Sequence, residues 1–137
     1  MKLYRSRKVI SAGLIIIVGI TFHSCKYDTF ENEPCQLKIP DEVSFHADIL
    51  PVLRENCSTV GCHSGGNPTG HLNLDDSLAY GELSRAGSGY INTNIPTHSL
   101  FYSQLISISQ PMPPNGKLDD CTIEMILRWI KQGALNN

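Results

Sequence analysis

Residues 57–63 read Cys-Ser-Thr-Val-Gly-Cys-His, and this short stretch decides how the rest of the chain is interpreted. Its two cysteines stand five positions apart, and His63 directly follows the second one. Covalent attachment of haem uses this order, because each thiol adds to one vinyl group of the porphyrin while the adjacent imidazole reaches the iron. The usual attachment motif has two residues between the cysteines, and this one has four. We therefore expect Cys57 and Cys62 to hold a haem c covalently, provided that the rest of the chain supports such a site.

A ligand for the opposite side of the haem is expected from residues 110–116, Gln-Pro-Met-Pro-Pro-Asn-Gly. In electron-transfer cytochromes the iron commonly takes one histidine and one methionine. Three prolines surround Met112, and each restricts its own backbone and that of the residue before it. We expect His63 as the proximal axial ligand and Met112 as the distal one. The alternative is a surface turn in which Met112 only fills a gap.

Other residues compete with Met112 for the distal position. His71 and His98 lie in or next to loops, and either could replace the methionine. Met125 falls within the last helical segment, where packing into the core is the more common role. His46 lies in the first helical segment and is expected to face solvent.

The chain begins with the features of an export signal. Four basic residues lie within the first eight positions, and residues 9–22 are almost wholly apolar. This run is shorter than the roughly twenty residues that a membrane-spanning helix needs. Ser24 then precedes Cys25, which resembles the cleavage site of a bacterial lipoprotein, where the cysteine is lipidated. Residues 1–24 are therefore expected to be a lipoprotein signal peptide; the alternative is ordinary cleavage, with Cys25 an incidental thiol.

The charge of the remaining chain limits its partners. The whole chain has 11 Lys and Arg against 13 Asp and Glu. Residues 1–24 carry four of the basic residues and no acidic one, so their removal leaves seven basic and thirteen acidic residues, a formal charge of −6. Nucleic acid is not expected as a partner, because binding to phosphates needs a basic face. Electrostatic capture of a basic partner stays open.

Two of the five cysteines are left for a disulfide. Cys25 is assigned to the lipid, and Cys57 and Cys62 are assigned to the haem. Cys35 opens the folded part of the chain and Cys121 opens its last helix, so a bond between the two ends is expected, because exported thiols tend to oxidise. Such a bond would stabilise the fold by roughly 4 kcal/mol through the entropy of the unfolded chain. The alternative is two free thiols in the core.

The polar, acidic residues 25–40 are expected to form a tether, and residues 41–137 are expected to form a single folded domain. A first helical segment is predicted over residues 41–56, with Ser44 as its cap. Pro51 predicts that this helix is kinked, or that it restarts with the proline in its first turn.

The clearest predicted element is the last helix. Asp119 is its N-cap, and Gly133 is a natural stop after its C-terminal end. Arg128 and Lys131 are expected on its solvated face rather than at the carboxylates of a haem. The apolar positions follow the helical repeat i, i+3, i+4, i+7, at Ile123, Ile126, Leu127 and Ile130.

Long irregular loops fill the space between the two terminal helices. Glycine and proline predict a loop over residues 57–71 and irregular chain over 86–97. Short helices are expected over residues 76–84, with Leu78 and Leu83 inward, and over residues 99–106. The longer predicted elements are therefore helices separated by irregular loops, with a short extended piece around Asn73.

Four pieces of the chain together resemble a known family. They are residues 45–53 (Phe-His-Ala-Asp-Ile-Leu-Pro-Val-Leu), the motif at 57–63, Met112-Pro113-Pro114, and residues 129–134 (Trp-Ile-Lys-Gln-Gly-Ala). In this order they resemble the small c-type cytochrome domains of exported bacterial proteins, over about residues 43–135. The resemblance implies an all-α cytochrome c fold whose first and last helices pack across each other, with His63 and Met112 as axial ligands. Similar domains in Bacteroidetes-like lipoproteins often carry four residues between the haem cysteines.

The expected function is electron transfer by a small monohaem cytochrome, which is a carrier of electrons and not an enzyme. Its partners would be a redox protein and, through the lipid on Cys25, a membrane at the periplasmic side of the cell envelope or the outer membrane. One alternative is a haem-free binding or structural lipoprotein in which Cys57 and Cys62 form a disulfide. In a variant of it, these cysteines and His63 bind zinc, although zinc usually takes four ligands. A further alternative is the haem module of a larger redox enzyme.

Overall fold

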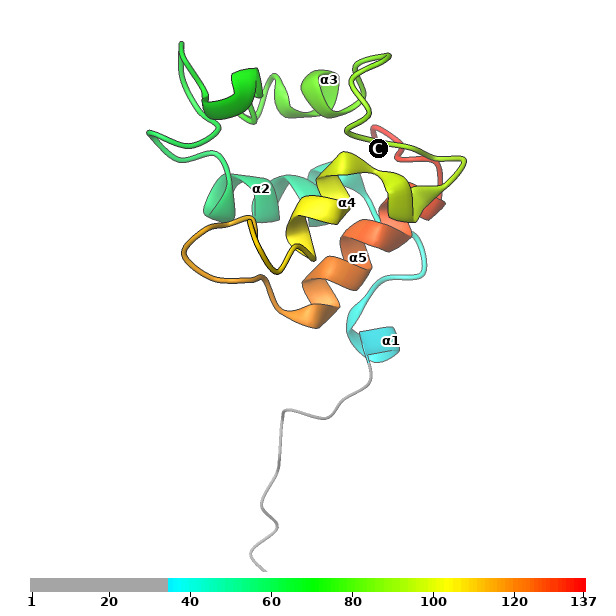
Figure 1. Cartoon of the computed structure of the whole chain (residues 1–137). Coiled ribbons are helices and arrows are strands. Elements are labelled where there is room, and N and C mark those ends of the chain that lie inside the picture. The colour runs from blue at the N-terminus through cyan, green and yellow to red at the C-terminus, as the bar shows by residue number, and fades with distance from the viewer. Residues whose placement is uncertain (1–34) are drawn as a thin grey trace, which may run out of the picture. The chain divides into compact units, whose positions relative to one another are not determined.

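The computed structural model describes residues 35–137, and the regular elements in this range are helical, with no strand. Irregular chain separates most of them. No helix in this range is long and apolar enough to cross a membrane. The predicted signal peptide, Cys25 and the first part of the predicted tether lie outside the described residues. The elements, shown in Figure 1, are α1 (Cys35–Lys38), η2 (Phe45–Ile49), α2 (Leu50–Asn56), η3 (Thr69–His71), α3 (Ala79–Leu83), η4 (Pro96–His98), α4 (Leu100–Leu105) and α5 (Asp120–Lys131).

The first helical segment is capped at Ser44 and changes its helical type just before Pro51. The Ser44 hydroxyl accepts a hydrogen bond from the Ala47 N–H at 3.1 Å, and the Asp48 carboxylate accepts one from the Ser44 N–H at 2.8 Å. These reciprocal bonds satisfy N–H groups that a helix start leaves free. A π-helical turn, η2, is followed by α2, whose first turn contains Pro51. Ile49 and Leu50 both have right-handed helical backbone, so the segment passes from η2 into α2 without a break, and it begins at residue 45 and not 41. Of the two predicted effects of Pro51, its place in the first turn of an α-helix is confirmed.

The last helix, α5, has the predicted boundaries. The Asp119 carboxylate accepts hydrogen bonds from the Cys121 N–H at 3.1 Å and the Thr122 N–H at 3.0 Å, as an N-cap does. After the helix, Gly133 has a φ of 98°, a left-handed conformation that favours glycine. The predicted apolar face is buried, together with one more residue, Trp129.

An aromatic cluster joins the beginning and the end of the domain. The ring of Phe45, fully buried, lies 5.5 Å from that of Trp129 and 5.2 Å from that of Tyr80, measured between centroids. The main-chain oxygen of Asn137 accepts hydrogen bonds from the Ser44 hydroxyl at 2.7 Å and from the His46 N–H at 2.9 Å. The start of η2 is thus held against α5 and the chain that follows it.

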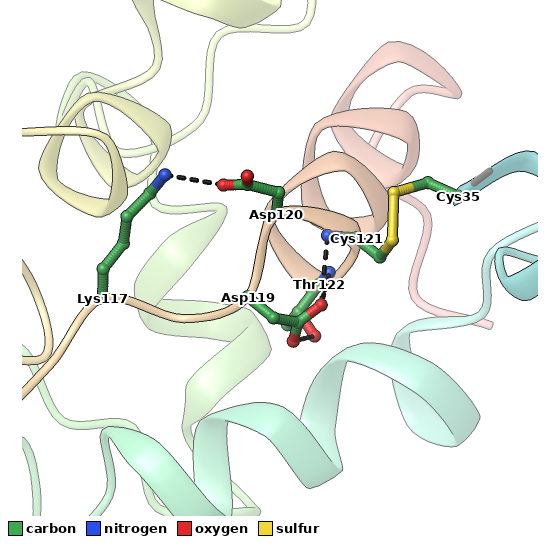
Figure 2. Close-up of a disulfide and its surroundings, with 6 residues drawn as sticks. All are labelled: Cys35, Lys117, Asp119, Asp120, Cys121 and Thr122. Carbon is green, nitrogen blue, oxygen red and sulfur yellow. Dashed lines mark hydrogen bonds and ion pairs between the residues drawn. A yellow bond between two sulfur atoms is a disulfide. The ribbon is translucent and has the colours of Figure 1, made fainter. Parts of the chain in front are cut away.

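A disulfide between Cys35 and Cys121 joins α1 to the first turn of α5, as Figure 2 shows. Next to it, Ile39 is buried in the core, and the Arg128 guanidinium donates to the carbonyl oxygen of Pro40 at 3.0 Å. Residues 35–40 therefore belong to the folded unit, whereas the sequence suggested a tether up to residue 40. The pairing of two distant cysteines is what draws this polar segment into the fold. Arg128 binds this segment instead of lying on a purely solvated face.

The two short central helices are shorter than predicted. The helix expected over 76–84 covers Ala79–Leu83, and the one expected over 99–106 covers Leu100–Leu105. Leu83 is buried, but Leu78 is exposed because it precedes the first helical turn and so does not lie on its inner face. Such short helices depend on the residues around them, since isolated helices of this length are unstable.

Candidate functional site

A cavity of about 650 Å³ lies between the chain that follows α2, the helix α4 and the proline-rich segment before α5. Its volume is in the range of sites that bind small molecules and cofactors, roughly 300–1,000 Å³. Cys57, Cys62, His63 and Met112 all line it. The cavity thus brings together the four residues that the sequence predicted to hold a haem. Apolar side chains make up much of its remaining wall, namely Leu72, Leu74, Leu100, Phe101, Leu105, Pro113, Pro114 and Leu118.

Main-chain hydrogen bonds close the segment between the two cysteines into a compact turn. The Cys62 N–H donates to the Thr59 carbonyl oxygen at 2.9 Å, and the His63 N–H donates to the Cys57 carbonyl oxygen at 3.2 Å. Gly61 has a φ of 85°, which any other residue would adopt only with strain. The four intervening residues therefore form a turn that leaves both cysteines on the same cavity.

The two cysteines differ in their surroundings. Cys57 is buried and Cys62 is half-buried, and both are free thiols. Burial, and to a smaller extent the charge of the neighbouring Cys62, raises the pKa of the Cys57 thiol to about 11. Cys57 is therefore held as a neutral thiol at physiological pH.

The imidazole of His63 is oriented by a backbone carbonyl group. Its Nδ1 atom lies 3.3 Å from the carbonyl oxygen of Leu72. Because a carbonyl oxygen only accepts hydrogen bonds, this contact places the ring proton on Nδ1 and leaves the lone pair on Nε2. Histidine ligands of metals are typically fixed by such a bond from the other ring nitrogen.

Asp75 connects the beginning of the motif to the residues that follow it. Its carboxylate accepts hydrogen bonds from the Ser58 hydroxyl at 3.0 Å, the Ser64 hydroxyl at 2.7 Å and the Gly65 N–H at 3.1 Å. These bonds hold the pKa of Asp75 below its usual value, and the bond from the Ser64 hydroxyl has the largest effect. No motif in the sequence predicts this role for Asp75. The only local signal is Asn73, whose side-chain oxygen accepts from the Asp75 N–H at 2.8 Å in a turn typical of Asx residues.

Met112 is fixed by a bond to α4 as well as by its neighbouring prolines. The Met112 N–H donates to the carbonyl oxygen of Gln104 at 3.1 Å, and the Gly116 N–H donates to that of Pro113 at 3.3 Å. The peptide bond between Met112 and Pro113 is cis. The side chain of Met112 is half-buried at the cavity wall.

The other candidates for the distal position lie elsewhere. His71 and His98 are exposed and do not line the cavity. His46 is exposed, as predicted, and Met125 packs partly buried against the core. Within residues 35–137, His63 is the single histidine at the cavity, and Met112 is the single methionine.

Lys117 and Glu55 are the charged residues that line the cavity within the described range. The Lys117 ammonium group pairs with the Asp120 carboxylate at 2.6 Å, close to the start of α5 (Figure 2). Lys131, by contrast, lies away from the cavity, with its ammonium group 3.9 Å from the carboxylate of Glu124. Lys117 is therefore the cation best placed to meet an acidic group of a bound ligand, a role for which the sequence offered no signal.

Within residues 35–137, no group of three or more His, Cys, Asp and Glu side chains is arranged to hold a metal ion. A haem iron takes only two axial ligands from the protein, one of which can be a methionine. Comparison of the chain with known protein families, with curated proteins and with solved structures found no match. The function is therefore inferred from the chemistry of the site.

Proposed function

We propose that the chain is a monohaem c-type cytochrome that carries single electrons, with the haem bound in the cavity described above. The observation that carries this proposal is that Met112 lines the same cavity as Cys57, Cys62 and His63, although it lies on a separate loop beyond α4. Bound haem would supply a centre that takes up and releases one electron reversibly. The chain would supply the attachment, the two axial ligands and the exclusion of water.

The donor atoms around the cavity fit a haem c. Cys57 and Cys62 offer two free thiols for covalent attachment. His63 offers Nε2, since its Nδ1 donates to the carbonyl oxygen of Leu72. Met112 offers a neutral thioether, a ligand that raises the reduction potential of haem. The apolar walls suit the faces of a porphyrin, and Lys117 would neutralise a haem carboxylate if it exchanged its present partner, Asp120, for that group.

The same ligand set favours a carrier of electrons over an enzyme. With a histidine and a methionine as axial ligands, no position on the haem is left for a substrate. We therefore propose that the partner is another redox protein, and that nucleic acid is not a partner. The haem module of a larger redox enzyme would be favoured instead if the distal position proved to be open.

The Cys35–Cys121 disulfide supports an exported protein, since such bonds persist in oxidising compartments and are rare in the cytosol. Together with the export signal, it leads us to propose a lipoprotein that is anchored through Cys25 and faces the periplasm or lies on the outer membrane. The signal and Cys25 lie outside the described residues, so this part of the proposal rests on the sequence.

The decisive experiment asks whether haem is bound covalently. The full chain is produced in a bacterial host that has the cytochrome-maturation machinery, and the purified protein is examined by its pyridine haemochrome spectrum. Mass spectrometry of the peptide that contains Cys57 and Cys62 then shows how many thioether bonds are formed. One haem on this peptide, with both thiols consumed, is expected. A haem-free protein with a Cys57–Cys62 disulfide would overturn the proposal and favour a haem-free binding or structural lipoprotein.

A further inference from the structure

The carboxylate of Asp75 is bonded to the first residue of the loop between the motif cysteines and to the residues beyond the motif. One of its oxygens accepts hydrogen bonds from the Ser58 hydroxyl at 3.0 Å and from the Ser64 hydroxyl at 2.7 Å. The other oxygen accepts a bond from the Gly65 N–H at 3.1 Å. A single side chain therefore ties the start of this loop to the chain just past its end.

The main chain by itself gives the loop little restraint across its whole length. One hydrogen bond, from the His63 N–H to the Cys57 carbonyl oxygen at 3.2 Å, spans both cysteines. The freedom of a loop grows with its length, so four intervening residues hold two thiols less firmly than two residues do. In the part of the chain that the structure describes, the bond from Ser58 to Asp75 is the one side-chain hydrogen bond that residues 57–60 make.

This link lies outside the wall of the cavity. Ser58, Ser64 and Asp75 are half-buried, and none of the three lines the cavity, whereas their neighbours Cys57 and His63 do. A ligand in the cavity would therefore not touch the carboxylate. Any effect of Asp75 on such a ligand must act through the positions of the residues that it holds.

We propose that Asp75 is a positioning residue for covalent attachment of haem, which keeps the two thiols of this long motif at the spacing that two thioether bonds require. The inference rests on the proposed function. In each attachment a thiol S–H adds across a vinyl C=C bond. One C–S and one C–H bond form, the S–H bond and the π bond break, and no atom or electron is left over. The contribution of the protein is thus the placement of the thiols.

The two thiols are expected to depend on Asp75 to different degrees. Cys62 directly precedes His63, so an axial bond from His63 would by itself keep the Cys62 thiol near its vinyl group. Cys57 is joined to that pair only through the four-residue loop. The thioether bond of Cys57 should therefore be the one that needs the link through Asp75.

The test counts thioether bonds in Asp75→Asn, with the full chain produced in a host that has the cytochrome-maturation machinery. The haem peptide is treated with iodoacetamide in denaturant, and mass spectrometry shows which thiol was free. Loss of a hydrogen bond to a charged group should lower the population with Cys57 correctly placed by about tenfold. Haem attached through Cys62 alone, with Cys57 alkylated, is the expected product. The pyridine haemochrome band should also move to longer wavelength, because an unreacted vinyl group stays conjugated with the ring.

Two further variants compare the ends of the link with a neighbouring carboxylate. Ser58→Ala removes the same link from its other end, so it should give the same product, and its combination with Asp75→Asn should add little. Asp76→Asn is the matched control for the change of charge, because Asp76 pairs with Arg54 and not with the motif. Both thioether bonds should form in this variant.

A third variant separates positioning from general stability. The double variant Cys35→Ser with Cys121→Ser loses the disulfide, which lies outside the motif, and should still form both thioether bonds. If it too left Cys57 free, lower stability would explain the result for Asp75→Asn, and the inference would be wrong.

The outcomes also distinguish this inference from the proposed function. Two thioether bonds in all molecules of Asp75→Asn, or a single bond in the unsubstituted protein, would overturn the role of Asp75 and leave a haem protein. Absence of covalent haem from the unsubstituted protein would overturn the proposed function itself.

Discussion

The backbone N–H of Met112 donates to the carbonyl oxygen of Gln104 at 3.1 Å, and this bond ties the proline-rich loop to the end of α4. The side chain of Met112 lines the cavity from the loop before α5, whereas the cysteine motif lines it from the chain that follows α2. A flexible thioether binds reliably only when the backbone holds it in place. The Gln104 bond, added to the neighbouring prolines, provides that restraint.

Replacement of Met112 by alanine is expected to leave the haem covalently attached but to remove its distal ligand. The low-spin spectrum of a haem with histidine and methionine ligands should be lost, and the reduction potential should fall. Optical spectroscopy and potentiometric titration measure both changes. Met125→Ala is the matched control, because this methionine packs against the core; it should cost about 2 kcal/mol in unfolding free energy and leave the spectrum intact. An unchanged spectrum in Met112→Ala would point to His71, His98 or an open site.

Replacement of Asp75 by asparagine should loosen the turn around the haem cysteines, because three hydrogen bonds to its carboxylate are weakened or lost. Its folded-state pKa is lowered, so the carboxylate stabilises the fold fully above the unfolded pKa of about 3.9, and this contribution is lost as the pH falls through the lower folded value. The thermal midpoint of Asp75→Asn should therefore lie below that of the unsubstituted protein at pH 7, and the gap should close below pH 4.

Glu42→Gln is the control for Asp75→Asn, since Glu42 is exposed. It should leave the thermal midpoint at pH 7 nearly unchanged. If the difference in thermal midpoint between Asp75→Asn and the unsubstituted protein stayed constant down to pH 2, the carboxylate charge would not be what holds the turn.

Without haem, the two motif cysteines should react with iodoacetamide in a fixed order. Cys57 is buried and its pKa is raised to about 11, so at pH 8 it is almost entirely protonated and slow to react. Cys62 is more exposed and should be alkylated first. Because the pKa of the Cys57 thiol is raised, the rate for Cys62 should be about tenfold higher or more. Mass spectrometry of the haem-free protein at successive times gives the order. In denaturant the two rates should become equal; equal rates in the folded protein would contradict the described burial.

Removal of the Cys35–Cys121 disulfide is expected to destabilise the fold by about 2–5 kcal/mol, because the bond closes a loop with a sequence separation of 86 residues. The double variant Cys35→Ser with Cys121→Ser should therefore unfold at a lower urea concentration. Covalent haem content should stay the same, since Cys57 and Cys62 are not involved. The unsubstituted protein in reductant should match the variant, and a large difference between the two would assign the loss to the substituted side chains instead.

The parts of the fold that follow from short-range sequence signals could be predicted. The cap at Asp119, the buried face of α5 and the stop at Gly133 are set within one helix, and the place of Pro51 in the first turn of α2 follows from the missing proline N–H. The parts that depend on distant contacts could not. Neither the bonds that Asp75 accepts from Ser58 and Ser64 nor the bond that Met112 donates to Gln104 has a periodic signal in the sequence.

In the candidate site, too, the residues in local motifs could be predicted and those placed by distant contacts could not. Cys57, Cys62 and His63 form a local motif, and the prolines around Met112 make that residue conspicuous. Lys117 was missed because its position at the cavity depends on how the loop before α5 folds back. Residues 35–40 were assigned to a tether from their composition, although the predicted disulfide between Cys35 and Cys121, which the structure contains, already implied that this segment joins the fold.

The disulfide has a mechanical consequence for the cavity. All the residues that line it, from Glu55 to Leu118, lie within the covalent ring that the bond between Cys35 and Cys121 closes. A force that pulls residue 35 away from the end of α5 would pass through the disulfide into the helix and would bypass the ring. A single proteolytic cut inside the ring would leave its two pieces covalently joined. The chain around the cavity is thereby shielded from tension applied at residue 35.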